Sequence, residues 1–263
     1  MRVLPFAQPL ISEIEKHSVL EALESPQLVH GPKSEKFEKA FVEFLGGGYA
    51  TSTSSATTAL QLAYMALGVG AGDEVIVTSL THVASVNSIV AVGAKPVFVD
   101  VSLKDGNILV SKIEEAITKF TKAICVVHFL GLPVDLNLIK RITNKYKLFL
   151  IEDCALALGA FFSEKHVGLH GDFGAFSFYP AKHITTGEGG MLVSSNPDIL
   201  EKAKKIKSFY YDRDASVREI PGLYDIVGFG LNFRMSEVAS ALGLAQLKRV
   251  HEFSEKRQTN TQK

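Results

Sequence analysis

The chain alternates short apolar runs with longer stretches in which apolar residues recur at every third or fourth position. Four runs rich in valine, isoleucine, leucine or phenylalanine have the length of strands, at residues 72–78, 96–101, 123–128 and 148–151. Helical spacing fills the intervals between them, at residues 83–92, 111–118 and 136–146. Strands that alternate with helices predict a mainly parallel sheet with helices on both faces. In such α/β folds, ligands gather at the carboxyl ends of the strands.

Helical patterns also occupy both ends of the chain. Residues 12–23 predict a first helix, and phenylalanines at helical spacing after Gly31 and Pro32 predict a second, which three glycines from Gly46 onward stop. In the interior, Ser111 and Glu114 have the spacing of a capping box. Near the other end, residues 236–253 read as one long amphipathic helix, and a polar tail follows at 254–263.

The amino-acid composition limits the classes of molecule that the chain is expected to bind. Lys plus Arg and Asp plus Glu balance at 28 each, so no basic field for nucleic acid or for a membrane surface is expected. Cys125 and Cys154 lie in apolar surroundings without metal-ligand spacing, which favours a reduced cytoplasmic protein and no metal site. The longest apolar stretch, at 123–134, is interrupted by His128 and Pro133 and is too short to span a bilayer.

A single lysine stands between an aromatic stretch and a glycine cluster. Phe176 and Phe178 alternate with a serine, which predicts a half-buried strand that Pro180 ends by removing a hydrogen-bond donor. An amine just beyond a strand end, such as that of Lys182, can be partly desolvated. Desolvation disfavours its charged form and leaves a nucleophile able to form a Schiff base. An ordinary surface lysine before a glycine turn is the alternative.

Small hydroxyl residues fill positions 51–58 and lead into an apolar helix that runs to Leu67. The free N–H groups at a helix start attract anions, and serine and threonine hydroxyls add donors, so this helix start is a candidate phosphate site. Ordinary N-capping explains the same pattern.

Two polar residues follow predicted strands at the edge where ligands gather. His82 comes after the strand that ends near Thr78, and Asp153 comes after the run at 148–151. A carboxylate in that place needs a cationic or hydrogen-bonding partner. The protonated ring nitrogen of pyridoxal phosphate would be such a partner. A helix cap or a metal ligand is the alternative for Asp153.

Seven motifs stand in a fixed order along the chain, at residues 55–60, 72–76, 93–100, 152–155, 176–182, 187–190 and 232–235. In this order the chain closely resembles the DegT-type nucleotide-sugar aminotransferases, which are fold type I pyridoxal-phosphate enzymes. The resemblance runs from about residue 31 to about residue 257. It implies a three-layer α/β fold with a mainly parallel sheet of the seven-stranded type. The cofactor-binding large domain would cover residues 1–253 and include an N-terminal helical segment at 1–48.

The resemblance also implies roles for individual residues. Lys182 would hold pyridoxal 5'-phosphate through a Schiff base and later move the proton. Asp153 would hold the pyridinium, and His82 occupies the aromatic position that stacks on the ring. Ala56, Thr57 and Ser177 would bind the phosphate.

Asn232 matches an asparagine that in relatives reaches the phosphate of the neighbouring subunit, which implies a homodimer with shared active sites. The implied reaction moves an amino group from glutamate to a nucleotide-linked keto-sugar, in amino-sugar and surface polysaccharide (O-antigen) biosynthesis. Lysine at position 182 opposes a sugar dehydratase, because those lyases have histidine there.

Three features depart from the family pattern. Ala56 replaces a more usual glycine. Leu156 stands where many relatives have glutamine or histidine bonded to the phenolic oxygen of the cofactor, and leucine has no hydrogen-bonding group. Relatives also continue into a small C-terminal domain, whereas this sequence stops at Lys263. The alternative is therefore a truncated remnant that binds the cofactor with weak or absent turnover.

Overall fold

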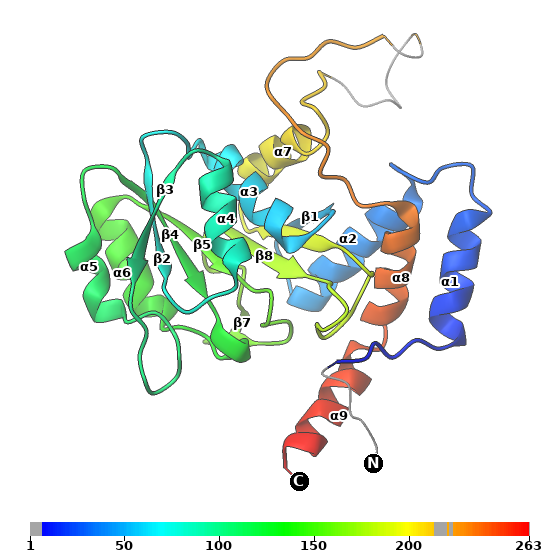
Figure 1. Ribbon diagram of the computed structural model, residues 1–263. Coiled ribbons are helices and arrows are strands. Elements are labelled where there is room, and N and C mark those ends of the chain that lie inside the picture. The colour runs from blue at the N-terminus through cyan, green and yellow to red at the C-terminus, as the bar shows by residue number, and fades with distance from the viewer. Residues whose placement is uncertain (1–6, 213–219, 221–222, 263) are drawn as a thin grey trace.

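The computed structural model describes residues 7–212, 220 and 223–262. Their centre is a seven-stranded sheet in the order β1-β9-β8-β5-β4-β2-β3 (Figure 1). Its strands are β1 Tyr49–Thr53, β2 Glu74–Thr78, β3 Lys95–Val99, β4 Thr121–Val127, β5 Phe149–Asp153, β8 Phe173–Ser177 and β9 Gly190–Ser194. β9 runs antiparallel to both of its neighbours, and the other pairs are parallel. The expected mainly parallel α/β sheet is confirmed.

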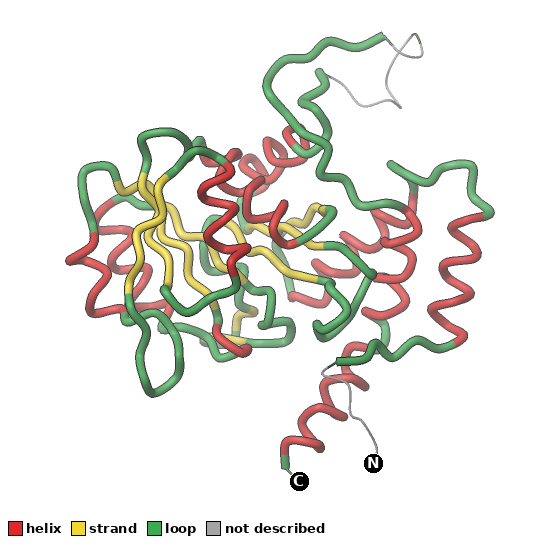
Figure 2. Tube along the Cα trace, viewed as in Figure 1, coloured by secondary structure: helices red, strands yellow, loops and turns green. Residues whose placement is uncertain are grey.

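Helices flank the sheet on both faces (Figures 1 and 2). The helices of the described chain are α1 Glu13–Leu23, α2 Pro32–Leu45, α3 Ala56–Leu67, α4 Val83–Ala91, α5 Ile113–Ala116, α6 Leu136–Tyr146, α7 Pro197–Ile206, α8 Glu237–Leu247 and α9 Val250–Thr261. Of these, α1 packs against α8 rather than against the sheet. Along β4, Ala123 and Cys125 belong to one apolar cluster, and Ile124 and Val126 belong to the other. Residues of α3, α4 and α7 complete the first cluster, and residues of α2, α6 and α8 complete the second. The sheet is therefore buried on both faces.

The first two helices form as the sequence predicts. Ser12 caps α1 in a capping box with Glu15. α2 ends at Gly46, whose φ of 79° lies in the left-handed region that glycine adopts without strain. Gly31 has no side chain to cap the start of α2, and the carboxylate of Glu237 instead accepts from Lys33 N at 2.7 Å. A residue of α8 thus caps α2.

The helix expected at 111–118 is shorter than the pattern indicates. The chain forms the 3₁₀ turn Val110–Lys112 and then the single turn α5, and no capping hydrogen bond from Ser111 starts it. The reason lies at the other end, where the Thr118 hydroxyl donates to Glu74 Oε2 at 2.6 Å and Thr118 N donates to Thr121 Oγ1 at 2.9 Å. These bonds hold residue 118 in a turn before β4.

Two strands differ from expectation in their burial. β1 is built from small hydroxyl residues that the sequence did not mark as a strand, and it is buried because its polar groups find partners: Ser52 donates to Glu38 from N at 2.7 Å and from Oγ at 2.8 Å. β8 was expected to be half-buried. Phe173 and Ala175 are as fully buried as Phe176, so this central strand is covered on both faces.

The helical stretch expected at 236–253 is two helices. α8 ends at Leu247, and Arg249 is not helical, with φ −106° and ψ 6°. α9 then continues through the polar residues to Thr261. The Arg249 side chain pairs with the buried carboxylate of Glu15 at 2.9 Å, which ties the break to α1. In the described part of the chain, no helix has the length and apolar character needed to cross a membrane.

Candidate active site

Lys182 lies in the loop that connects β8 to β9. Its backbone N–H donates to Tyr179 O at 2.9 Å, and Thr186 N donates to Phe178 O at 2.9 Å, so the loop is closed on itself. Burial lowers the pKa of Lys182, while the negative charge of Asp153 acts in the opposite direction. A lowered pKa increases the fraction of neutral amine, which is the nucleophilic form. These surroundings favour the nucleophile over an ordinary surface lysine.

Asp153 is the last residue of β5 and is 5% exposed. Its Oδ2 accepts from Ser85 Oγ at 2.7 Å, and its Oδ1 accepts from Ala155 N at 3.1 Å. Both donors are neutral. A buried carboxylate with neutral donors and an amine within electrostatic range suits a cationic ring nitrogen. The helix-cap alternative does not describe this geometry, because Asp153 ends a strand.

The start of α3 and the start of β9 form one cradle. Ser55 caps α3, so Ala56 and Thr57 are its first two helical residues, whose N–H groups have no acceptor within a helix. A Cβ atom placed on Gly190 would lie 2.6 Å from Ala56 N, so glycine is required for this close approach. Ser177 pairs with Gly190 across the β8–β9 ladder. The three residues predicted to bind phosphate are therefore brought together.

His82 and Asn232 lie at the edges of this region, and both are exposed. His82 caps α4, and its Nδ1 accepts from Ala84 N at 3.2 Å. Asn232 lies in a segment attached to the chain just before α3, because Ser54 N donates to Phe233 O at 2.8 Å. The ring-stacking role of His82 and the subunit-crossing role of Asn232 stay predictions.

The polar tail reaches back to the lysine loop. Arg257 of α9 donates from Nη2 to Lys182 O at 3.2 Å. The adjacent His183 has its pKa lowered to about 4 by burial and by the positive charges of Arg257 and Lys182. His183 is therefore neutral at neutral pH. Sequence reasoning missed Arg257, since nothing in its local pattern connects it to position 182.

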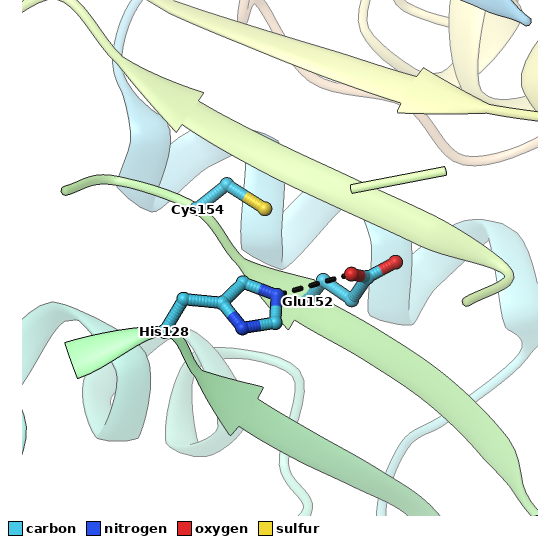
Figure 3. A group of neighbouring side chains, drawn as sticks. All are labelled: His128, Glu152 and Cys154. Atoms are coloured by element: carbon cyan, nitrogen blue, oxygen red, sulfur yellow. Dashed lines mark hydrogen bonds and ion pairs between the residues drawn. The ribbon is translucent and has the colours of Figure 1, made fainter. Parts of the chain in front are cut away.

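Glu152 precedes Asp153 and is completely buried (Figure 3). Its carboxylate accepts from the backbone N–H groups of Gly168, His170 and Gly171 at 2.8, 2.8 and 2.6 Å. His128 Nε2 lies 3.0 Å from Oε2. Burial alone would raise the pKa of Glu152, but the hydrogen bond from His128 and those from the backbone outweigh it and keep the pKa below its usual range.

His128, Glu152 and Cys154 also form a group whose possible metal-ligand atoms lie within 4.8 Å of one another. Val134 N donates to His128 Nδ1 at 3.3 Å, so Nε2 carries the proton and donates to Glu152. Burial raises the pKa of the Cys154 thiol well above its usual value. His128 and Glu152 are joined by a hydrogen bond within this group.

Sequence reasoning missed three contacts at the site: the Ser85 hydroxyl on Asp153, the approach of Gly190 to Ala56, and the four donors on Glu152. Ser85 left a weak signal, because it is a polar residue on the buried face of a predicted apolar helix. The donors on Glu152 come from elements distant in sequence, so no local pattern could reveal them.

A family model described as the DegT/DnrJ/EryC1/StrS aminotransferase family matches residues 9–263. The chain belongs to this aminotransferase family. It is 41% identical over 254 residues to GDP-perosamine synthase of Escherichia coli O157:H7, covering 96% of this chain and 68% of that protein. The family assignment by motif order is confirmed.

Two solved aminotransferase-family structures share the fold. Helicobacter pylori PseC, an aminotransferase involved in pseudoaminic acid biosynthesis, superposes with a TM-score of 0.89 at 34% identity, covering 95% of this chain and 67% of that one. Spr1654 from Streptococcus pneumoniae in its PMP-form gives a TM-score of 0.93 at 30% identity, covering 98% and 70%. The chain thus spans about two thirds of the length of the relatives it matches.

The cofactor of this family is pyridoxal phosphate, and Spr1654 is also known in a PLP-form. The residues of this chain fit the group. Gly190 lets β9 approach the start of α3, whose first N–H groups have no acceptor within the helix. Asp153 offers a buried carboxylate for a ring nitrogen, and the amine of Lys182 has a lowered pKa.

Proposed function

We propose that this chain transfers an amino group from glutamate to a nucleotide-linked keto-sugar with pyridoxal phosphate as cofactor. The observation that carries the proposal is that Lys182, in the loop between β8 and β9, is partly buried and feels the negative charge of Asp153. β9 begins at Gly190, which approaches the backbone at the start of α3. The sugar aminotransferases among its relatives support the substrate class.

When bound, the cofactor supplies an aldehyde that takes up amines and a ring that accepts electrons. The chain supplies the rest. The N–H groups of Ala56 and Thr57 and the hydroxyl of Ser177 would hold the phosphate. Asp153 would accept a hydrogen bond from the ring nitrogen and favour its protonated form. The amine of Lys182 would serve as nucleophile and as the base that moves the proton of the amino donor.

The test is an absorbance titration with pyridoxal phosphate, before and after glutamate. Wild-type protein should show an absorbance band that depends on Lys182 and that glutamate removes. Lys182→Ala should show no such band. Lys165→Ala is the matched control, since burial also lowers the pKa of Lys165 although it lies in the β6–β7 hairpin (β6 Phe161–Phe162, β7 Lys165–His166). A band of equal strength in Lys182→Ala would refute the proposal.

We also propose a homodimer in which Asn232 serves the phosphate of the neighbouring subunit. Its exposed position on a segment attached near α3 supports this arrangement. Mixing Lys182→Ala protein with Asn232→Ala protein should restore activity, because one site of each hybrid dimer then keeps both residues. Hybrids no more active than either parent would contradict shared sites.

We also propose that the chain takes part in the biosynthesis of surface polysaccharides such as O-antigen. The proposed location of the protein is the cytoplasm. Support comes from the spore coat polysaccharide protein SpsC of Bacillus subtilis, a 38% identical relative. The free, buried Cys125 and Cys154 suit a reducing compartment. Cell fractionation of the native host, with a known cytoplasmic enzyme as marker, tests the location.

A chain that binds the cofactor with little turnover is the second candidate, and Leu156 favours it. This residue follows Asp153 by three positions and is partly buried, yet it offers no hydrogen bond to the cofactor's phenolic oxygen. Leu156→Gln should raise turnover with glutamate by roughly three- to tenfold, the effect of one added hydrogen bond. Leu156→Met is the control of similar size. Equal turnover in both variants would remove Leu156 as a cause of weak activity.

A further inference from the structure

The carboxylate of Asp153 is held by a hydroxyl chain that no part of the proposed function uses. Ser85 Oγ donates to Asp153 Oδ2 at 2.7 Å, and both residues are buried. Thr81 Oγ1 lies 2.7 Å from Ser85 Oγ. The remaining oxygen of Asp153 is held by Ala155 N at 3.1 Å. The side-chain donor on Asp153 is thus Ser85, and the other donor is backbone.

The chain of hydroxyls has a direction. An ionised carboxylate only accepts hydrogen bonds, so the proton of Ser85 points to Asp153. The Ser85 oxygen is then free to accept, and Thr81 must be the donor across their 2.7 Å contact. Charge-assisted bonds of this kind are the stronger ones, and a chain of them is reinforced by polarisation.

The location links two parts of the candidate site. Thr81 and His82 lie in the short segment between β2 and α4, and Ser85 lies in the first turn of α4. Asp153 ends β5, two strands away in the sheet. The hydroxyl chain therefore joins the segment expected to stack on the cofactor ring to the carboxylate expected to hold its nitrogen.

The thiols and phenol near Asp153 remain neutral. Burial, together with the negative charge of Asp153, raises the pKa of Cys125 to about 12. Burial likewise raises the pKa of Tyr64 and of Cys154 well above their usual values. The hydrogen bonds to the Asp153 carboxylate come from the hydroxyl of Ser85 and the backbone N–H of Ala155, and Lys182 acts on it electrostatically.

We propose that Ser85, oriented by Thr81, is a positioning residue that fixes the Asp153 carboxylate toward the ring nitrogen of pyridoxal phosphate. The inference rests on the proposed function and names a determinant within that site. It predicts that removing the Ser85 hydroxyl weakens the ring-nitrogen contact and leaves the phosphate cradle at α3 intact.

The ligand for the test is pyridoxamine phosphate, because it binds without a covalent bond to Lys182. Its analogue in which the ring nitrogen is replaced by CH serves as the comparison. Ser85→Ala should bind pyridoxamine phosphate roughly tenfold more weakly than wild type, as expected for a lost hydrogen bond to a charged group. Its affinity for the CH analogue should change less than about twofold, since that ligand makes no ring-nitrogen contact.

Ser88→Ala is the matched control. Ser88 is also buried on α4, and its hydroxyl donates to Ser85 O at 3.0 Å rather than to Asp153. The Ser88→Ala variant should bind pyridoxamine phosphate and its CH analogue with wild-type affinity. Thr81→Val keeps the shape of the side chain without the hydroxyl. Like Ser85→Ala, it should lose affinity for pyridoxamine phosphate only, but by a smaller factor of about two- to threefold.

The outcomes separate this inference from the function it rests on. Wild-type protein that fails to bind pyridoxamine phosphate would overturn both. Wild-type binding with equal losses for the two ligands in Ser85→Ala would overturn only the positioning role, since a general disturbance of the fold affects both ligands alike. If Ser85→Ala loses affinity for pyridoxamine phosphate but not for the CH analogue, the positioning role is supported. This holds even if the variant has a lower thermal stability, because lost stability would weaken the binding of both ligands.

Discussion

Two neighbouring acidic residues at the end of β5 have opposite surroundings. The carboxylate of Glu152 accepts from three backbone N–H groups and from His128. That of Asp153 accepts from Ser85 and from Ala155 N. Successive strand residues point to opposite faces, so the two carboxylates meet different partners, and that of Asp153 also acts electrostatically on Lys182. Both carboxylates are buried, and they differ in that Asp153 has fewer hydrogen-bond donors and acts electrostatically on an amine.

The largest effect on turnover is expected from replacing the carboxylate proposed to hold the ring nitrogen. Asp153→Asn should lower turnover with glutamate by roughly 10²- to 10³-fold, because an amide cannot keep the ring nitrogen protonated. The free energy of unfolding should change little, since the asparagine oxygen can accept from Ala155 N while its NH2 group donates to Ser85 Oγ, whose hydroxyl can turn to Thr81. Steady-state rates and urea unfolding together test this. Nearly unchanged turnover would place Asp153 outside the chemistry.

Glu152→Gln should show the reverse pattern. An amide offers one acceptor oxygen and turns two N–H groups toward donors, so the variant should lose about 3 kcal/mol of unfolding free energy. The folded fraction should keep the absorbance band of the bound cofactor. Urea unfolding measures the loss, with Glu114→Gln on the surface as control. If Glu152→Gln were as stable as wild type but lost the absorbance band of the bound cofactor, Glu152 rather than Asp153 would be the carboxylate that serves the cofactor.

A smaller effect is expected in the pH dependence of the unfolding free energy, which reports on the ionised state of Glu152. The pKa of Glu152 is lowered by folding, so its contribution to stability is present above the unfolded value of about 4.3 and is lost as pH falls toward the folded value. The difference in unfolding free energy between wild type and Glu152→Gln should therefore shrink below about pH 4.3.

Urea unfolding at several pH values between neutral and acidic conditions tests this dependence. At Glu15, burial is outweighed by hydrogen bonds from Ser12 and Arg249, and the pKa falls to about 2. Glu15 titrates in both proteins, so it cancels from the difference. A difference that stays constant with pH would contradict the ionised state of Glu152.

The sequence predicted the elements whose signal is local. Helix α3 follows from hydroxyl residues before an apolar run, and α2 follows from aromatic spacing ended by Gly46. Lys182 and Asp153 became candidates because each follows a recognisable strand pattern. The family motifs suggested their chemical roles, which stay predictions.

What the sequence could not predict depends on contacts between distant segments. β1 is polar in sequence and is buried only because Glu38 of α2 accepts from Ser52. The predicted helix at 111–118 is cut short by bonds from Thr118 to β2 and β4. The hydroxyl of Ser85 reaches Asp153 across 68 positions of sequence. Each contact exists only once the sheet has assembled.

The most direct test of the central claim is to locate the covalent bond to the cofactor. Protein loaded with pyridoxal phosphate is reduced with borohydride, digested and analysed by mass spectrometry. The account predicts that the phosphopyridoxyl group is on Lys182, at close to one group per chain. Labelling on another lysine, or label spread over several surface lysines with Lys182 unmodified, would contradict it.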